Sequence, residues 1–121
     1  MLKVHARNLG NVAVLGLQGR MVRGEVEALR KAVEAQSKAA VVILDLGRVT
    51  AIDAGALGLM LQLRQQAEAR GMRLELMNVN RWVRQVLAVT CLDSVFRITS
   101  SVEFFPIAAR RNTPPVLASC A

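Results

Sequence analysis

The chain has 121 residues, a length typical of a single domain with its own hydrophobic core. Hydrophobic residues make up 53% of it and charged residues 21%, a balance that excludes a disordered chain. Sixteen Lys and Arg against nine Asp and Glu give a net charge of +7. No block of five or six like charges occurs, so the basic excess does not form a tail of the kind that binds nucleic acid.

The sequence contains no recognisable targeting or membrane segment. Its apolar runs are all shorter than the roughly 18 residues that a membrane-spanning helix needs. Residues 1–7 lack the cationic start and long apolar core of a secretory signal, so we expect a cytoplasmic protein. Cys91 and Cys120 lie at no metal-ligand or redox spacing, and we expect both to be free thiols.

A hairpin of two strands is predicted at the N-terminus. Residues 2–7 alternate apolar and polar side chains, which is typical of a strand with one exposed face. Gly10-Asn11 is a turn signal, and the apolar run from Val12 to Leu17 has the length of a second strand.

An amphipathic helix and a buried strand are predicted next. From Arg23 onwards, Val26, Leu29 and Val33 fall at helical spacing, which predicts a helix of about four turns. The run 41–44 is apolar without alternation and rich in β-branched residues, so we expect a strand that is buried on both faces.

Two polar residues mark the starts of two further helices. Asp53 is the expected N-cap of a helix over residues 54–70, and Asn80 the expected N-cap of a helix over residues 81–91. Between them, residues 72–79 alternate weakly and predict another strand.

The last structured elements are a short strand over residues 96–98 and a final helix. Ser100 and Glu103 have the spacing of a capping box, in which each side chain bonds to the backbone N–H of the other. The sequence predicts one domain over residues 1–108 and a flexible C-terminal tail over residues 109–121.

The predicted element order is β-β-α-β-α-β-α-β-α. Helices between strands imply crossover connections and parallel pairing, whereas the opening hairpin is antiparallel. The expected fold class is therefore α/β, with a mixed central sheet of about five strands and helices packed against it.

Candidate reactive groups are few. The chain has one histidine, His5, and no tyrosine, and His5 has no evident catalytic or metal-binding partner. Neither of the common glycine-rich phosphate loops occurs. Arg81 and Arg84 lie where a recognition helix would carry its base-reading residues, but exposed arginines are more often solvated, and the four aromatic residues make a poor platform for stacked bases. We expect no enzyme, no metal, no cofactor and no direct nucleic-acid binding.

The most informative segment is residues 41–58. A buried strand ends in Asp45-Leu46, a short loop follows, and Ile52-Asp53 then precedes a run of small residues at a helix start. This pattern closely resembles the STAS domain, the fold of anti-sigma-factor antagonists.

A second segment, residues 79–98, carries the same resemblance. It is similar to the third helix of the family and to the strand after it, with Leu92, Phe96 and Ile98 in a Leu-x-x-x-Phe-x-Ile pattern. The resemblance extends over about residues 2–108 and implies a single STAS-like domain that binds a protein partner in bacterial signalling and transcription regulation.

Two positions depart from the family pattern. In regulated members, the second residue after the Asp that corresponds to Asp53 is a Ser or Thr. A partner kinase, which is itself the anti-sigma factor, phosphorylates it. This chain has Gly55 at that position, after Ala54. The family often reads Gly-Glu-Leu-Asp after the second strand, whereas this chain reads Gly19-Arg20-Met21-Val22. We therefore expect no phosphorylation switch at residue 55, and a basic rather than acidic binding face.

The leading hypothesis is a non-enzymatic interaction module that binds an anti-sigma factor or a kinase-like regulator. The binding surface would comprise residues 50–61 and the loop 19–24, because small residues at a helix start let a partner approach its unpaired N–H groups. The same small residues would also let the helix pack closely on the sheet. The candidate partner-binding residues are Thr50, Asp53, Ala54, Gly55, Ala56, Leu57, Gly58, Arg20 and Arg23.

Two alternatives stay open. The first is a STAS subunit of a transport complex, such as a lipid ABC-type transporter, in which the same face contacts transporter subunits. The second is a module that binds a nucleotide or small anion at the helix start beside Arg20 and Arg23. In each case we expect no membrane insertion; the sequence leaves a homodimer open, and the basic charge favours an acidic partner.

Overall fold

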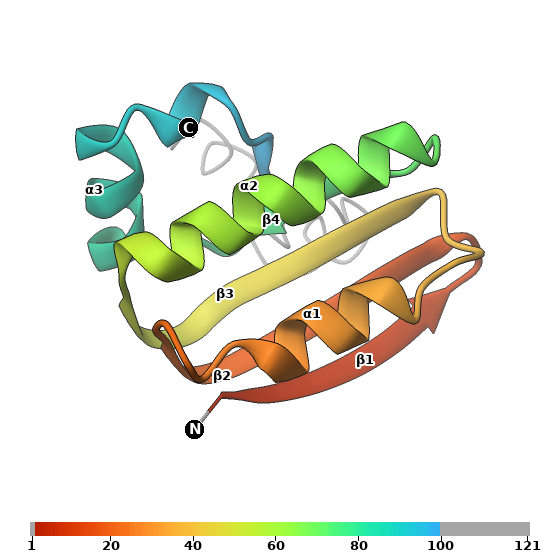
Figure 1. The fold of residues 1–121 in the computed structure, drawn as a ribbon, viewed down its shortest axis with the longest axis horizontal. Coiled ribbons are helices and arrows are strands. Elements are labelled where there is room, and N and C mark those ends of the chain that lie inside the picture. The colour runs from red at the N-terminus through yellow and green to blue at the C-terminus, as the bar shows by residue number, and fades with distance from the viewer. Residues whose placement is uncertain (1, 100–121) are drawn as a thin grey trace, which may run out of the picture.

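The structure, a computed structural model, describes residues 2–99. Along the chain (Figure 1) the elements are β1 (Lys3–Leu9), β2 (Val12–Met21), α1 (Glu27–Glu34), β3 (Val41–Ile52), α2 (Ala54–Ala69), β4 (Arg73–Met77), α3 (Arg81–Val89), a 3-10 turn (Leu92–Ser94) and β5 (Ile98–Thr99). The predicted order is confirmed as far as the fifth strand. The expected final helix, the domain boundary after residue 108, the tail and Cys120 lie outside the described residues.

The strands form one mixed sheet in the order β1-β2-β3-β4-β5. Strand β1 pairs with β2 antiparallel, and the other three pairings are parallel. Figure 1 shows α1 and α2 lying over the same face of the sheet. We call this the helix face, and the opposite side of the sheet the far face. The α/β class with a mixed central sheet is confirmed.

The main core lies between the sheet and the helices. Alternate residues of the strands point to the helix face, and Leu15, Leu44 and Leu76 are fully buried there. The helices contribute Leu29, Met60 and Leu87, which are also fully buried. Burying one such side chain contributes about 1.5–3 kcal/mol. Among residues 2–99 no helix has the length and apolar character to cross a membrane.

A smaller apolar cluster lies on the far face. It consists of Val14, Ile43 and Met77, which come from three neighbouring strands. Beside it, the carboxylate of Glu75 is buried and lies 3.6 Å from Nε of Arg73 and 3.7 Å from Nε of Arg97. The far face is thus partly apolar and partly charged.

The hairpin is confirmed, but the strands that follow it are longer than predicted. Gly10 in the turn has a φ of +66°, a backbone conformation that glycine adopts without strain. Strands β2 and β3 run on to Met21 and Ile52, rather than ending at Leu17 and residue 44, because they pair with each other as far as those two residues. Long-range pairing of this kind leaves no local signal in either segment.

The first helix is shorter than predicted. It covers eight residues from Glu27, not four turns from Arg23. Gly24 has a φ of +88°, which a right-handed helix excludes, and the N–H of Glu25 donates to the carbonyl of Val22 at 2.9 Å in a turn. The segment from Arg23 to Val26 therefore forms a loop in front of the helix.

The predicted N-cap of α3 is confirmed and also links two elements. Oδ1 of Asn80 accepts from the N–H of Val83 at 2.9 Å, and Nδ2 of Asn80 donates to the carbonyl of Val49 at 2.9 Å. One side chain therefore caps α3 and joins it to β3.

Replacing Asn80 should destabilise the domain. Asn80→Ala removes both hydrogen bonds and should lower the free energy of unfolding by about 1–2 kcal/mol. Asn80→Ser keeps an oxygen acceptor for the N–H of Val83 and loses the donor to Val49, so it should cost less than alanine. Urea denaturation followed by circular dichroism measures both, and a serine variant that is less stable than the alanine variant would contradict the capping role.

Candidate functional site

The candidate site lies where α2 and α3 begin. Helix α2 follows the carboxyl end of β3, and α3 follows the carboxyl end of β4, so both helix starts lie at the same edge of the parallel part of the sheet (Figure 1). The first N–H groups of each helix have no partner within the helix. This edge therefore presents hydrogen-bond donors and a partial positive charge.

Asp53 organises the start of α2. Its Oδ1 accepts from the N–H of Ala56 at 2.9 Å, which confirms it as the N-cap, and its Oδ2 accepts from the N–H of Arg23 at 2.9 Å. The carboxylate therefore joins the loop after β2 to the helix. The N–H of Arg23, followed by that of Ala56, holds the pKa of Asp53 below its usual value.

Arg23 packs across the helix start at Gly55. A Cβ placed on Gly55 would lie 2.8 Å from Cβ of Arg23 and 3.2 Å from its Cγ, closer than real Cβ contacts. Position 55 therefore has room for a hydrogen atom and not for a side chain while Arg23 stays where it is. Glycine at position 55 is compatible with this contact, whereas any larger residue would overlap Arg23.

The structure separates the predicted site residues into a surface group and a core group. Ala56 and Leu57 point into the core, with 0% and 5% of their surfaces exposed. Asp53 is half-buried in its hydrogen bonds. The exposed members are Thr50, Ala54, Gly55, Gly58, Arg20 and Arg23.

Two of the exposed residues have distinct surroundings. Oγ1 of Thr50 donates to the carbonyl of Gly19 at 3.2 Å, so this hydroxyl links β3 to β2. A Cβ on Gly58 would meet no atom within 4 Å, so one turn into α2 the helix surface is open. Gly58 is thus a position where a side chain can be added without disturbing the fold.

Trp82 also lies on this surface, although no sequence motif predicts it there. Trp82 is in the first turn of α3, next to Arg81, and 52% of its surface is exposed. The helical spacing of the apolar residues could have predicted its exposure. Val83 and Leu87 point inward, so position 82 is directed away from the core. Tryptophan is enriched, with tyrosine and arginine, among the residues that contribute most to binding at protein interfaces.

This edge offers contacts rather than reactive groups. Within residues 2–99 no three His, Cys, Asp or Glu side chains come together in a way that could hold a metal ion. His5 lies on β1, and Cys91 is an exposed free thiol after α3. Small residues, helix N–H groups, arginines and one exposed tryptophan form a surface suited to binding.

Comparisons with known proteins agree with this fold. The chain is 30% identical over 94 residues to a STAS-domain containing protein of Pseudomonas aeruginosa, with 74% of this chain and 90% of that protein covered. It superposes on the crystal structure of an anti-sigma factor antagonist from Mycobacterium paratuberculosis with a TM-score of 0.76 at 16% identity, covering 91% and 95% of the two chains.

Two further solved structures share the fold. A sulfate transporter family protein from Wolinella succinogenes matches with a TM-score of 0.66 at 21% identity, over 74% of this chain and 77% of the other. The protein Mglu matches with a TM-score of 0.55 at 29% identity, over 60% of this chain, and the chain spans only 18% of Mglu. Proteins of different kinds therefore share this fold in all or part of their length.

The family model described as "Mlab, STAS domain" matches residues 4–99, which is nearly all of the described structure. Together with the mixed five-stranded sheet and the Asp53-capped helix, this match shows that the chain belongs to the STAS domain family.

Proposed function

We propose that this protein is a non-enzymatic interaction module that binds a protein partner through the starts of α2 and α3 without being switched by phosphorylation at position 55. The observation that carries the proposal is the contact of Arg23 with Gly55. Glycine at position 55 has no hydroxyl, and the contact leaves no room for the side chain of a serine or threonine there. The neighbouring Ala54 and Gly58 are exposed for a partner.

The partner would be an anti-sigma factor or a kinase-like regulator in the cytoplasm. Arg20, Arg23 and Arg81 surround the helix starts, so complementary charge favours an acidic surface on the partner. Trp82 adds an apolar anchor at the same edge. Affinity measurements with purified regulators of this kind test the assignment directly.

A second candidate function is that of a subunit in a transport complex. The match to the Mlab STAS family and the structural likeness to a sulfate transporter family protein support it. A permanent complex would need no phosphorylation switch, which agrees with glycine at position 55. Stable co-purification with a transporter ATPase would favour this candidate over a regulator.

Adding a charged side chain at Gly58 tests the binding surface. Gly58→Glu projects from α2 without meeting other atoms, so the fold should remain intact while the affinity for the partner falls at least tenfold. The matched control is Gln66→Glu, the same added charge at an exposed position further along α2. Biolayer interferometry measures both affinities, and equal losses in the two variants would reject this surface.

A double-mutant cycle tests whether the contact with Arg23 excludes a side chain at position 55. Gly55→Ala should lower the free energy of unfolding by about 1–3 kcal/mol, because its methyl group overlaps Arg23. In an Arg23→Gly background the same change should become stabilising by about 1 kcal/mol or less, as expected for alanine in a helix. Urea denaturation gives the free energy of unfolding of the four proteins. An equal effect of Gly55→Ala in both backgrounds would show that the contact does not contribute to the cost of a side chain at position 55.

The surface also depends on the ionised Asp53 carboxylate. Its pKa is lowered in the folded state, so its stabilisation is present above the ordinary aspartate pKa of about 3.9 and is lost as pH falls through the lower folded value. The stability difference between the wild type and Asp53→Asn should be constant from about pH 7 to 5 and shrink below about pH 4. Denaturation at a series of pH values measures this, and a difference that persists at the lowest pH would contradict it.

A further inference from the structure

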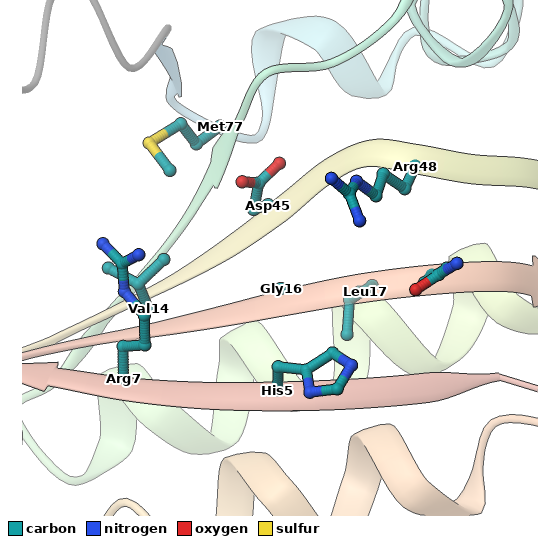
Figure 2. A pocket seen from close by; sticks show the side chains of 9 residues that line it. His5, Arg7, Val14, Gly16, Leu17, Asp45, Arg48 and Met77 are labelled. Carbon is teal, nitrogen blue, oxygen red and sulfur yellow. The ribbon is translucent and has the colours of Figure 1, made fainter.

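A hollow on the far face of the sheet lies away from the proposed partner surface. It has a volume of about 380 Å³ and is lined by residues of β1, β2, β3 and β4 (Figure 2). Pockets that take small molecules are typically about 300–1,000 Å³. The hollow is therefore large enough for a small organic molecule.

The hollow exists because β2 has no side chain at Gly16. Gly16 is in the middle of β2, where it pairs with His5 of β1 and Asp45 of β3. Its φ is not in the left-handed region, and a Cβ there would meet only the backbone oxygen of His5, at 3.7 Å. The position therefore has room for a side chain. Glycine inside a strand often marks a bulge, and one begins beside Gly16, or a place where a ligand approaches closely.

A β-bulge directs Arg48 to the same face. Gly16 pairs with Asp45 and Gln18 with Arg48, so β3 has one more residue than β2 across this interval. Leu46 and Val49 both remain buried on the helix face, and the extra residue leaves Arg48 exposed beside Gln18 on the far face. Bulges that redirect a side chain are common next to binding sites.

Cationic and donor groups surround the hollow. Arg7 and His5 come from β1, Gln18 from β2 and Arg48 from β3, and all four are exposed. Figure 2 shows Arg7 beside Val14 and Arg48 further along the sheet, with His5 and Asp45 between them. Within residues 2–99, neither Arg7 nor Arg48 forms an ion pair with a carboxylate.

The one carboxylate in the lining already has hydrogen-bond donors. Oδ1 of Asp45 accepts from the N–H of Gly47 in the bulge at 3.0 Å, and Oδ2 accepts from Nδ2 of Asn78 at 3.4 Å. The two positive charges of Arg7 and Arg48 exceed the single negative charge of Asp45. Buried Val14 and Met77 provide an apolar floor.

We propose that this hollow binds a small organic anion. Its phosphate or carboxylate group is held by Arg48, with His5 and Gln18 as further donors, and its apolar body lies over Gly16. A guanidinium group binds both kinds of anion through paired N–H groups. The site is independent of the partner surface at the starts of α2 and α3.

An NMR titration of the isotopically labelled full chain tests the proposal. The probes are butyl phosphate, pentanoate and inorganic phosphate, and the amide chemical shifts report binding. At least one organic probe should cause saturable shifts around Gly16 and bind more tightly than inorganic phosphate. The tighter of the two organic probes identifies the anionic group. Absence of saturable shifts with both, or equal binding of inorganic phosphate, would overturn the proposal.

Two variants locate the binding. Gly16→Val fills the hollow and Arg48→Gln removes the cation, so each should weaken binding of the organic probe at least tenfold. The control Arg70→Gln, at the exposed end of α2, and the partner-surface variant Gly58→Glu should bind as the wild type does. Circular dichroism checks the fold of Gly16→Val; if that variant does not fold, Arg48→Gln decides, and wild-type affinity in Arg48→Gln would overturn the proposal.

Discussion

The Asp53 carboxylate is the interaction on which the edge of this domain depends. It accepts from the N–H of Ala56 inside α2 and from the N–H of Arg23 in the loop after β2, which lies thirty residues before Asp53 in the sequence. A single charged group thereby sets where the helix begins and where the loop lies. With the loop held there, the Arg23 side chain lies over Gly55, where any larger residue would overlap it.

Two further side chains join parts of the chain at the same edge. Asn80 caps α3 and bonds to β3, and Thr50 joins β3 to β2. These bonds tie the loop and both helix starts to the sheet. The proposed partner surface would therefore lose less conformational entropy on binding than a surface built on unbonded loops.

The two faces of the sheet are used differently. The helix face carries the main core and accounts for most of the buried apolar surface. The far face combines a small apolar cluster, the Glu75 ion pairs and the hollow over Gly16. Basic residues lie at both places. Arg20, Arg23 and Arg81 surround the helix starts, whereas Arg7 and Arg48 line the hollow. Both proposed binding surfaces are therefore basic.

Local patterns in the sequence determined the class of fold, the hairpin and both N-caps, because alternation, helical spacing and capping residues act between neighbours along the chain. They also located the STAS pattern at Asp53. Only the tertiary structure decided that β2 and β3 extend to Met21 and Ile52, that Ala56 and Leu57 are core residues, and that Arg23 closes position 55. The hollow over Gly16 is decided in the same way, since it needs side chains from four strands. Each of these features arises from contact between segments distant in sequence, and such contacts leave no trace in the local periodicity.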